Sequence, residues 1–379
     1  MQQVIWRIPW TVFGWLPNGI PIYGFGLMLF IAFVACTVLA SSLPVREGIR
    51  KEILQDLGIW LFVGGIIGAR ITFLIDKHES IWQFFRIWDG GLVFYGSAIG
   101  GLAAYVFAYF YLIRKNHVST LRLADIIAPC IAVGLCIGRL GCLLNGCCFG
   151  NVVCPDCYQP QIQFPFSSPP RYDLTYSGYQ TAAGFTMAES GPDSRTVGAV
   201  DPASAAAVGG LKPGDIIIKA IAVPTRSELD EQHIEHVGQL YDFLTQHWPR
   251  GKNQLTLQVK RGNEELTIGP FAPATLGLHP TQLYESISMA LAFFLLMAYL
   301  PFRKHPGELM AIIMFCYGLH RYFNEMLRID QRPLGFEKYI SLFLIVAGIV
   351  FWGWLRIMPT KRIQVTSNKQ GDAHVQIAR

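Results

Sequence analysis

The stretch ADIIAPCIAVGLCIGRLGCLL, residues 124–144, decides the fold class. It carries two charged side chains, those of Asp125 and Arg139, in an otherwise apolar run. A helix of about 20 apolar residues crosses the roughly 30 Å of hydrocarbon in a bilayer. Further runs of this kind lie at residues 20–40, 54–75, 91–113, 283–301, 308–327 and 339–358. The sequence therefore predicts an all-α polytopic membrane protein with about seven transmembrane helices.

The overall composition also favours a membrane protein. Hydrophobic residues make up 52% of the 379 residues and charged residues 15%, and the mean hydropathy is +0.34. Soluble domains are usually less apolar and carry more charge. The net charge is +5, but the basic residues are spread among the loops, so nucleic acid is not an expected partner.

The distribution of basic residues predicts the orientation in the membrane. Lysines and arginines follow the first, third, fifth and seventh predicted spans: Arg46, Arg50, Lys51, Arg114, Lys115, Arg122, Arg303, Lys304, Arg356, Lys361 and Arg362. Because cytoplasmic loops are enriched in such residues, we expect the N-terminus and the 145–277 connection outside and the C-terminus in the cytoplasm. Residues 1–21 lack the pattern of a removable signal peptide, so the first span is expected to act as the anchor.

The long connection predicts a domain of its own, because it differs in composition from the spans. Residues 151–183 are rich in Pro, Ser and Cys and are expected to be irregular. Across 184–273, short alternating runs (RTVGAV, DIIIKAIAV, NQLTLQVKRG and ELTIGP) predict strands, and HVGQLYDFLTQHW predicts a helix. The remaining boundaries are 1–150 for the first four spans, 274–358 for the last three and 359–379 for a cytoplasmic tail.

The inserted α+β domain resembles PDZ domains in the stretch VDPASAAAVGGLKPGDIIIKAIAV, residues 200–223. Such modules add an extended peptide to the edge of a sheet. The loop that receives a peptide carboxylate is not evident in this chain. The sequence therefore leaves open whether the domain binds a peptide ligand or shields the outer face.

Charged side chains inside the predicted spans indicate a functional site. Arg139 lies at the outer end of the fourth span, and Arg321, Glu325 and Arg328 share one face of the sixth. A charged group in the bilayer costs about 2.5–3.5 kcal/mol on insertion scales unless it is paired or hydrated. Ion pairs that only join helices would explain these residues. Alternatively, arginines on two helices form a receptacle for phosphate, which favours a phospholipid headgroup as ligand.

Five motifs resemble the phosphatidylglycerol–prolipoprotein diacylglyceryl transferase family. They are IYGFGLML (22–29), WDGGLVFYGSAIGG (88–101), DIIAPCIAVGLCIGRLGCLLNG (125–146), HPTQLYE (279–285) and GLHRYFNEMLRID (318–330). The resemblance implies a bacterial inner-membrane enzyme that moves the diacylglyceryl group of phosphatidylglycerol to the lipobox cysteine of a prolipoprotein. A thioether forms and glycerol 1-phosphate leaves. The partners implied are these substrates and membrane lipid, without a cofactor or metal.

The resemblance also implies roles for individual residues. Arg139 and Arg321 would hold the lipid phosphate, and Arg321 would also serve the chemical step. The other matching positions imply phosphatidylglycerol binding by Tyr23, Gly138 and Asn145, catalysis by His279 and support by Glu325 and Arg328.

This chain departs from the family pattern at three positions. Tyr95 stands where many members have a histidine proposed as the base, Cys142 replaces an asparagine and Cys147 replaces a glutamate. A phenol has a pKa near 10, so Tyr95 accepts a proton at neutral pH only with cationic assistance. Three alternatives therefore remain for the base: Tyr95 with help from nearby arginines, His279 in its place, or another group.

Five cysteines lie close together in the sequence, at Cys142, Cys147, Cys148, Cys154 and Cys157. Outside the membrane the last four are expected to form disulfides, to remain thiols or to hold zinc. A membrane transporter is the alternative function, because intramembrane charges also mark substrate paths. A membrane protease is disfavoured, because the chain has no His-Glu-x-x-His motif and no nucleophile-elbow spacing.

Overall fold

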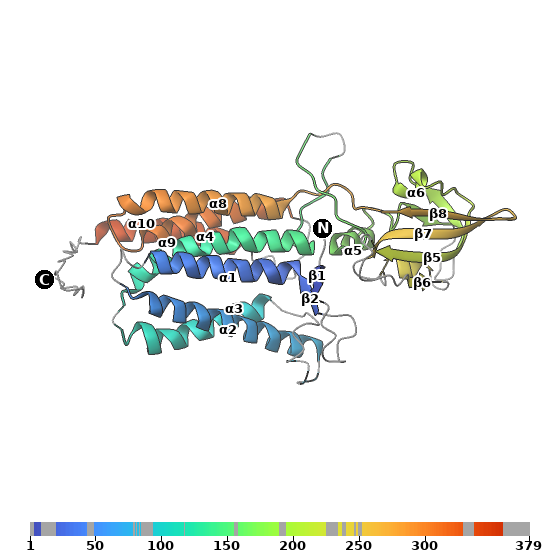
Figure 1. Ribbon diagram of the computed structural model, residues 1–379. Helices are drawn as coiled ribbons and strands as arrows, with labels where there is room; N and C mark the ends of the chain where they lie inside the picture. Colours follow the sequence, from blue (N-terminus) through green and yellow to red (C-terminus); the bar gives the residue numbers. More distant parts are fainter. Residues whose placement is uncertain are drawn as a thin grey trace.

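The computed structural model describes residues 4–8, 20–43, 49–78, 80, 82, 84, 94–116, 118–154, 158–188, 195–224, 234–236, 240–245, 248, 252–328 and 337–358. Long helices form one end of the molecule and a strand-rich unit forms the other (Figure 1). The predicted tail at 359–379 lies outside the described residues.

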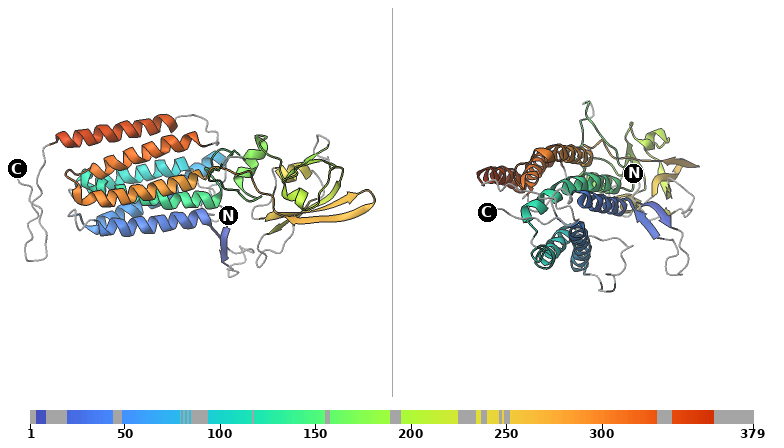
Figure 2. Two further views of the ribbon diagram at one scale, coloured as in Figure 1. Left: turned by 90° about the horizontal axis from the view of Figure 1, so that it is seen from above. Right: turned by 60° about the vertical axis from the view of Figure 1, so that its left-hand side comes forward.

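The helical part consists of long helices that lie side by side in all views (Figures 1 and 2). They are α1 (Gly24–Ser42), α2 (Lys51–Lys77), α3 (Phe94–Ala108), α4 (Thr120–Asn145), α8 (Thr281–Tyr299), α9 (Glu308–Met326) and α10 (Glu337–Ile357). The π-helical turn η4 (Tyr109–Ile113) extends α3, and the 3-10 turn η5 (Leu300–Phe302) extends α8.

The expectation of seven spans is confirmed in part. Within the described residues, five segments are long and apolar enough to cross a membrane: Gly24–Ser42, Lys51–Asp76, Thr120–Asn145, Thr281–Phe302 and Tyr339–Ile357. The other two predicted runs correspond to α3 with η4 and to α9. The apolar helix in the first covers Ile99–Ile113, and α9 carries a histidine, an arginine and two glutamates that lower its hydropathy.

The first predicted span begins later than expected because a hairpin precedes it. Strand β1 (Val4–Ile8) pairs antiparallel with β2 (Ile20–Tyr23). Tyr23 ends β2 and is the N-cap residue of α1. This tyrosine therefore lies at the junction of hairpin and helix.

Helix α4 has a central position in the bundle, because it packs against α1, α8 and α9. Buried apolar side chains from α4, α8 and α9 form one core cluster that includes Ala132, Met289, Leu296 and Ile313. Each such side chain contributes about 1.5–3 kcal/mol when it is removed from water, or less where lipid is the alternative surroundings. This core fixes the relative positions of the three helices that carry the candidate site.

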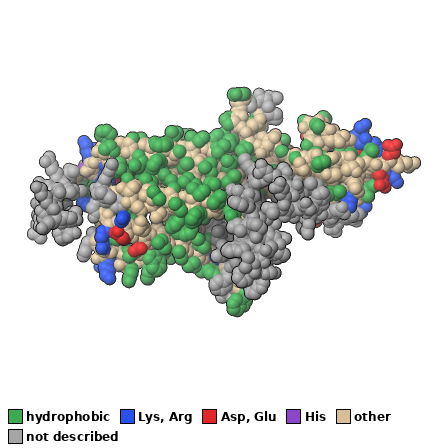
Figure 3. Space-filling model, in the orientation of Figure 1, with side chains coloured by type: hydrophobic (Ala, Val, Ile, Leu, Met, Phe, Trp, Pro, Cys, Tyr) green, Lys and Arg blue, Asp and Glu red, His purple; other side chains and the backbone are tan. Residues whose placement is uncertain are grey.

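Hydrophobic side chains cover much of the face of the helical part that Figure 3 shows. Many large apolar residues there are exposed, including Phe30, Val38, Phe107, Leu291 and Phe343. Contiguous apolar surfaces of this size are unusual on soluble proteins. The several long apolar helices and their exposed apolar side chains together indicate a multi-pass membrane protein.

The insertion forms an α+β unit beyond the helices (Figure 1). Its elements are α5 (Pro169–Tyr176), β3 (Phe185–Met187), β4 (Val197–Val200), α6 (Ala205–Val208), β5 (Ile216–Pro224), β6 (Ile234–His236), α7 (Leu240–Thr245), β7 (Lys252–Arg261) and β8 (Glu264–Phe271). An antiparallel sheet has the order β6-β5-β7-β8, and β3 pairs with β4. The four predicted strands correspond to β4, β5, β7 and β8.

The segment expected to be irregular, 151–183, is tied to the chain that returns toward the membrane. Val152 and Ile162 both form β-bridges with Leu278, and Pro165 bridges Ala274. The amide of Val153 donates to the carbonyl of Gly277 at 2.8 Å. The α+β unit therefore leaves and rejoins the helical part through paired segments.

Candidate active site

A buried glutamate joins the three helices that carry the candidate site. Glu285 follows the first turn of α8, and its side chain is 0% exposed. Arg139 of α4 places its Nε 2.9 Å from Glu285 Oε1, and Arg321 of α9 places an Nη1 3.8 Å from Oε2. Asn324 donates its Nδ2 to the same Oε2 at 3.2 Å. Two guanidinium groups from separate helices therefore approach one carboxylate.

Arg321 is held on its other side by its own helix. Its Nη2 lies 2.9 Å from Glu325 Oε2, one turn further along α9. Within the described residues, Arg321 Nη1 is buried and has no hydrogen-bond acceptor. A buried guanidinium N–H without an acceptor is costly, so this atom is available to an anionic ligand.

Two polar side chains of α9 complete the surroundings. Tyr317 lies near Arg139, and His320 lies near Glu285, Arg139 and Arg321. Spacings of three and four residues from Tyr317 to His320 and Arg321 place these groups on neighbouring faces of the helix. The arrangement is a buried polar cluster inside an apolar bundle.

Four residues of this cluster were not expected as site residues from the sequence: Glu285, Tyr317, His320 and Asn324. The available signal was a carboxylate inside the predicted span 283–301, since an unpaired carboxylate there would be costly. Which group it pairs with depends on the packing of α4, α8 and α9. The sequence pattern alone does not supply that packing.

The remaining predicted lipid-binding residues lie near the end of α4 or at the start of α1. A Cβ on Gly138 would meet nothing within 4 Å, so the space next to this part of the α4 backbone is open. Asn145 is the last residue of α4. Within the described residues, Tyr23 forms no hydrogen bond or ion pair with the cluster. The structure therefore brings together Arg139, Arg321 and Glu325 but does not join Tyr23 to them.

Within the described residues, the base candidate His279 forms no hydrogen bond or ion pair with Arg139 or Arg321. His279 Nδ1 lies 3.5 Å from the Tyr284 hydroxyl, and its backbone carbonyl accepts from Gly150 at 3.0 Å. Tyr95 belongs to the first turn of α3, and its side chain lies outside the described part. The predicted supporting residue Arg328 forms a β-bridge with Gly150.

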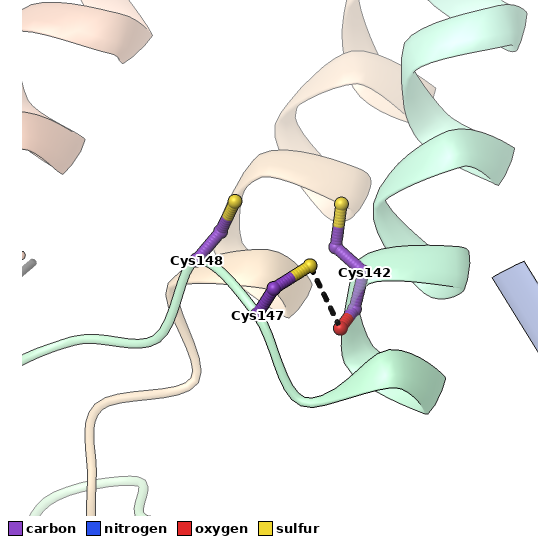
Figure 4. A group of neighbouring side chains, drawn as sticks. All are labelled: Cys142, Cys147 and Cys148. Atoms are coloured by element: carbon purple, nitrogen blue, oxygen red, sulfur yellow. Dashed lines mark hydrogen bonds between the residues drawn. The ribbon is translucent and has the colours of Figure 1, made fainter. Parts of the chain in front are cut away.

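Three cysteines gather where α4 ends (Figure 4). The Sγ atoms of Cys142, Cys147 and Cys148 all lie within 4.8 Å of one another, and the three residues are free thiols. The pKa of the Cys148 thiol is lowered because the other two thiols hydrogen-bond to it and because Arg328 and Arg139 lie nearby. The cluster thus takes in Cys142, whereas the expected group combined Cys147 and Cys148 with Cys154 and Cys157.

The other two cysteines of the expected group are placed differently. Cys154 is exposed, and Cys157 lies outside the described residues. The reason for the observed grouping is the helix end: Gly146 adopts a left-handed φ of 74°, which turns the chain back along the last turn of α4. Cys147 and Cys148 then face Cys142.

Comparison with known proteins gives one consistent family. The family model described as prolipoprotein diacylglyceryl transferase matches residues 12–354. A phosphatidylglycerol–prolipoprotein diacylglyceryl transferase from Rhodopirellula baltica is 26% identical over 378 residues, covering 88% of this chain and 72% of the relative. The same-named protein from Clostridium tetani is 23% identical, covering 87% and 92%. One from Trichormus variabilis is 35% identical over 137 residues, covering 35% of this chain and 47% of the relative.

Proposed function

Because the chain belongs to the prolipoprotein diacylglyceryl transferase family, we propose that Arg139 and Arg321 hold the phosphate of phosphatidylglycerol while its diacylglyceryl group moves to a lipobox cysteine. The chain is a transferase, and the relatives' names give its donor and acceptor classes. The transporter alternative leaves this family membership unexplained.

The observation that carries the proposed phosphate site is the approach of both guanidinium groups to Glu285. A phosphodiester presents two oxygens to a guanidinium fork, and arginines bind such groups through paired hydrogen bonds. Arg321 Nη1 is buried and lacks an acceptor within the described residues. The phosphate would supply that acceptor.

The charges of the cluster are balanced before a ligand binds. Two arginines (Arg139 and Arg321) form ion pairs with two glutamates (Glu285 and Glu325), so their formal charges sum to zero. The phosphodiester of phosphatidylglycerol carries one negative charge. Its proposed binding therefore rests on hydrogen bonds to the guanidinium groups and not on a net positive charge of the cluster.

The same groups would stabilise the transition state. A thiolate attacks the glyceryl carbon next to the phosphate, the carbon–oxygen bond breaks and glycerol 1-phosphate leaves with the electron pair. Negative charge then grows on the phosphate oxygen, and preorganised guanidinium groups stabilise such charge more strongly than water does. His279, or Tyr95 with cationic help, would take up the thiol proton.

The lipid is proposed to enter from the outer leaflet of the bacterial inner membrane. The space beside Gly138 on α4 is open, and the Arg139 side chain is 16% exposed, so we propose that a headgroup reaches the arginines while its acyl chains stay in hydrocarbon. Seven spans, an outer N-terminus and a cytoplasmic C-terminus fit the basic residues at Arg303, Lys304 and Arg356.

The α+β unit is proposed to be a PDZ-like module on the outer side. The order β4, α6, β5, β6, α7, β7, β8 supports this assignment. An extended peptide would pair with an edge of its sheet.

The test of the proposed function is a transfer assay. Purified full-length protein is mixed with phosphatidylglycerol and a lipobox peptide, and the mass of the peptide is followed. A diacylglyceryl increment on the cysteine, absent when the peptide carries serine instead, is the expected result. A protein that folds and binds lipid but never modifies the peptide would contradict it.

A further inference from the structure

We propose that Cys142, Cys147 and Cys148 form a zinc site with three thiolate ligands and an open fourth position, which receives the thiol of the acceptor cysteine. The proposal rests on the proposed function for the identity of that acceptor. It assigns to this chain a way of activating the thiol, at a position where the family pattern places no metal ligand.

The spacing of the sulfur atoms suits zinc. The three Sγ atoms lie within 4.8 Å of one another. Figure 4 shows the Cys147 thiol directed at the backbone carbonyl of Cys142, to which it donates at 3.7 Å. Zinc binds thiolate at about 2.3 Å in tetrahedral geometry, which places sulfur atoms about 3.8 Å apart. Inward shifts of roughly 1 Å or less would therefore complete the three-sulfur set.

The backbone holds the two loop cysteines in this position. Cys148 has a φ of 60°, in the left-handed region that non-glycine residues rarely adopt. The carbonyl of Cys147 accepts from Gln282 Nε2 at 2.8 Å, and that of Cys148 accepts from Thr281 Oγ1 at 2.7 Å. The first turn of α8 thus fixes a loop conformation that would otherwise be unfavourable, and it keeps both thiols within 4.8 Å of the Cys142 thiol.

The nearby charges fit a metal–thiolate group. Three thiolates and one Zn²⁺ carry one net negative charge, which is costly in a partly buried place unless it is compensated. Arg139 interacts electrostatically with Cys142 and Cys148, and Arg328 does so with Cys148. These guanidinium groups would offset that charge. The same Arg139 approaches Glu285, so the metal would lie next to the proposed phosphate site.

Three ligands leave one position open, as in catalytic rather than structural zinc sites. The acceptor thiol would bind there, displace a water molecule and pass its proton to the base, His279 or Tyr95, because a thiol on Zn²⁺ is deprotonated. The zinc-bound thiolate then forms the carbon–sulfur bond as the carbon–oxygen bond to phosphate breaks. The neutral thioether is a weaker ligand, so it leaves and water returns.

This activation would help a chain that has Tyr95 where a histidine base is expected. A free thiol with a pKa near 8.5 is about 3% thiolate at pH 7, so complete deprotonation would raise the rate by at most roughly 30-fold. The parent protein should then show a flat rate between pH 6 and 8. The zinc-free protein should lose roughly 10- to 30-fold at pH 7, and its rate should rise with pH.

The experiment uses the full-length chain in detergent. The protein is loaded by dialysis against a buffer that contains zinc, and unbound zinc is then removed. Phosphatidylglycerol is left out, so that no transfer occurs. Zinc content is measured by elemental analysis and its ligands by zinc X-ray absorption. We expect about one zinc per chain with three sulfur ligands, and a fourth sulfur after a lipobox peptide is added. The same peptide with serine in place of cysteine should leave the zinc with three sulfur ligands.

The variants Cys142→Ser, Cys147→Ser and Cys148→Ser should each lose bound zinc, whereas the matched control Cys316→Ser on α9 should retain it. If a variant fails to fold, the ligand count in the parent protein still decides. The proposal is overturned by absence of retained zinc, by a disulfide between any two of the three cysteines, or by zinc coordination that the cysteine peptide does not change.

A transfer assay separates this inference from the proposed function. Full transfer by chelated, zinc-free protein would overturn thiol activation and leave the transferase assignment intact. Zinc binding with a peptide-dependent fourth sulfur, in a protein that transfers nothing, would support the metal site and contradict the transferase function.

Discussion

Replacing Arg321 with alanine should sharply reduce diacylglyceryl transfer. Its side chain is 10% exposed, its Nη1 is buried without an acceptor within the described residues, and its Nη2 lies 2.9 Å from Glu325. Two charge-assisted hydrogen bonds to phosphate, at about 1.5–3 kcal/mol each, correspond to at least about 3 kcal/mol. Arg321→Ala should therefore lower kcat/KM for phosphatidylglycerol by at least roughly 100-fold.

The assay follows peptide mass against phosphatidylglycerol concentration in mixed micelles. Arg321→Lys keeps the charge but loses the planar fork, so an intermediate loss is expected. Arg356→Ala is the matched control, because Arg356 lies on α10 with a side chain 43% exposed. Since Arg321→Ala also leaves two buried glutamates less compensated, thermal unfolding is measured in parallel. A folded Arg321→Ala protein with kcat/KM within a few-fold of the parent would refute the phosphate-holding role.

Three further predictions test other groups. Tyr95→Phe should slow transfer roughly 100-fold if the phenol takes part in proton transfer; full activity would exclude it. Asp125→Asn should lower the midpoint of thermal unfolding, because the Asp125 carboxylate accepts hydrogen bonds from Arg303 and from backbone amides at the start of α9. Loss of this buried ion pair should cost about 3 kcal/mol or more of folding free energy. An unchanged midpoint would contradict this. Asp215→Asn should speed hydrogen exchange in β5 and β7 at pH 7, because Arg261 lowers the pKa of Asp215.

The pH dependence of the last variant has a defined sign. A carboxyl with a lowered pKa stabilises the folded state above its unfolded pKa near 3.9, and this contribution is lost as pH falls through the folded pKa. The difference between parent and Asp215→Asn should therefore be present at neutral pH and shrink in strong acid. A difference that grows as pH falls would contradict the ion pair with Arg261.

The sequence predicted the arginines of the site more fully than their partners. Arg139 and Arg321 stand out because guanidinium groups in apolar runs are costly, and the spacing of Arg321 and Glu325 predicts their contact along one helix. Glu285 is different, because its contact with both arginines requires the packing of α4, α8 and α9. Periodicity shows which face of each helix is polar but not which helix lies opposite.

The cysteine cluster was predicted only in part, for a similar reason. Sequence proximity grouped Cys147 and Cys148 with the exposed Cys154, whereas the left-handed turn at Gly146 reverses the chain and adds Cys142. A glycine after a helical run does predict such a reversal. The position of the loop depends further on hydrogen bonds from α8, which come from residues more than 130 positions away.

The paired segments at the base of the α+β unit have a consequence for its evolution. The amides of Val153 and Leu278 donate to Gly277 and Ile162, so the outgoing and returning chains meet before the sheet begins. The cost of closing a loop depends only weakly on its length. An inserted module of another size could therefore replace the α+β unit beyond these paired segments. The helices that carry Glu285 and Arg139 would keep their positions relative to each other.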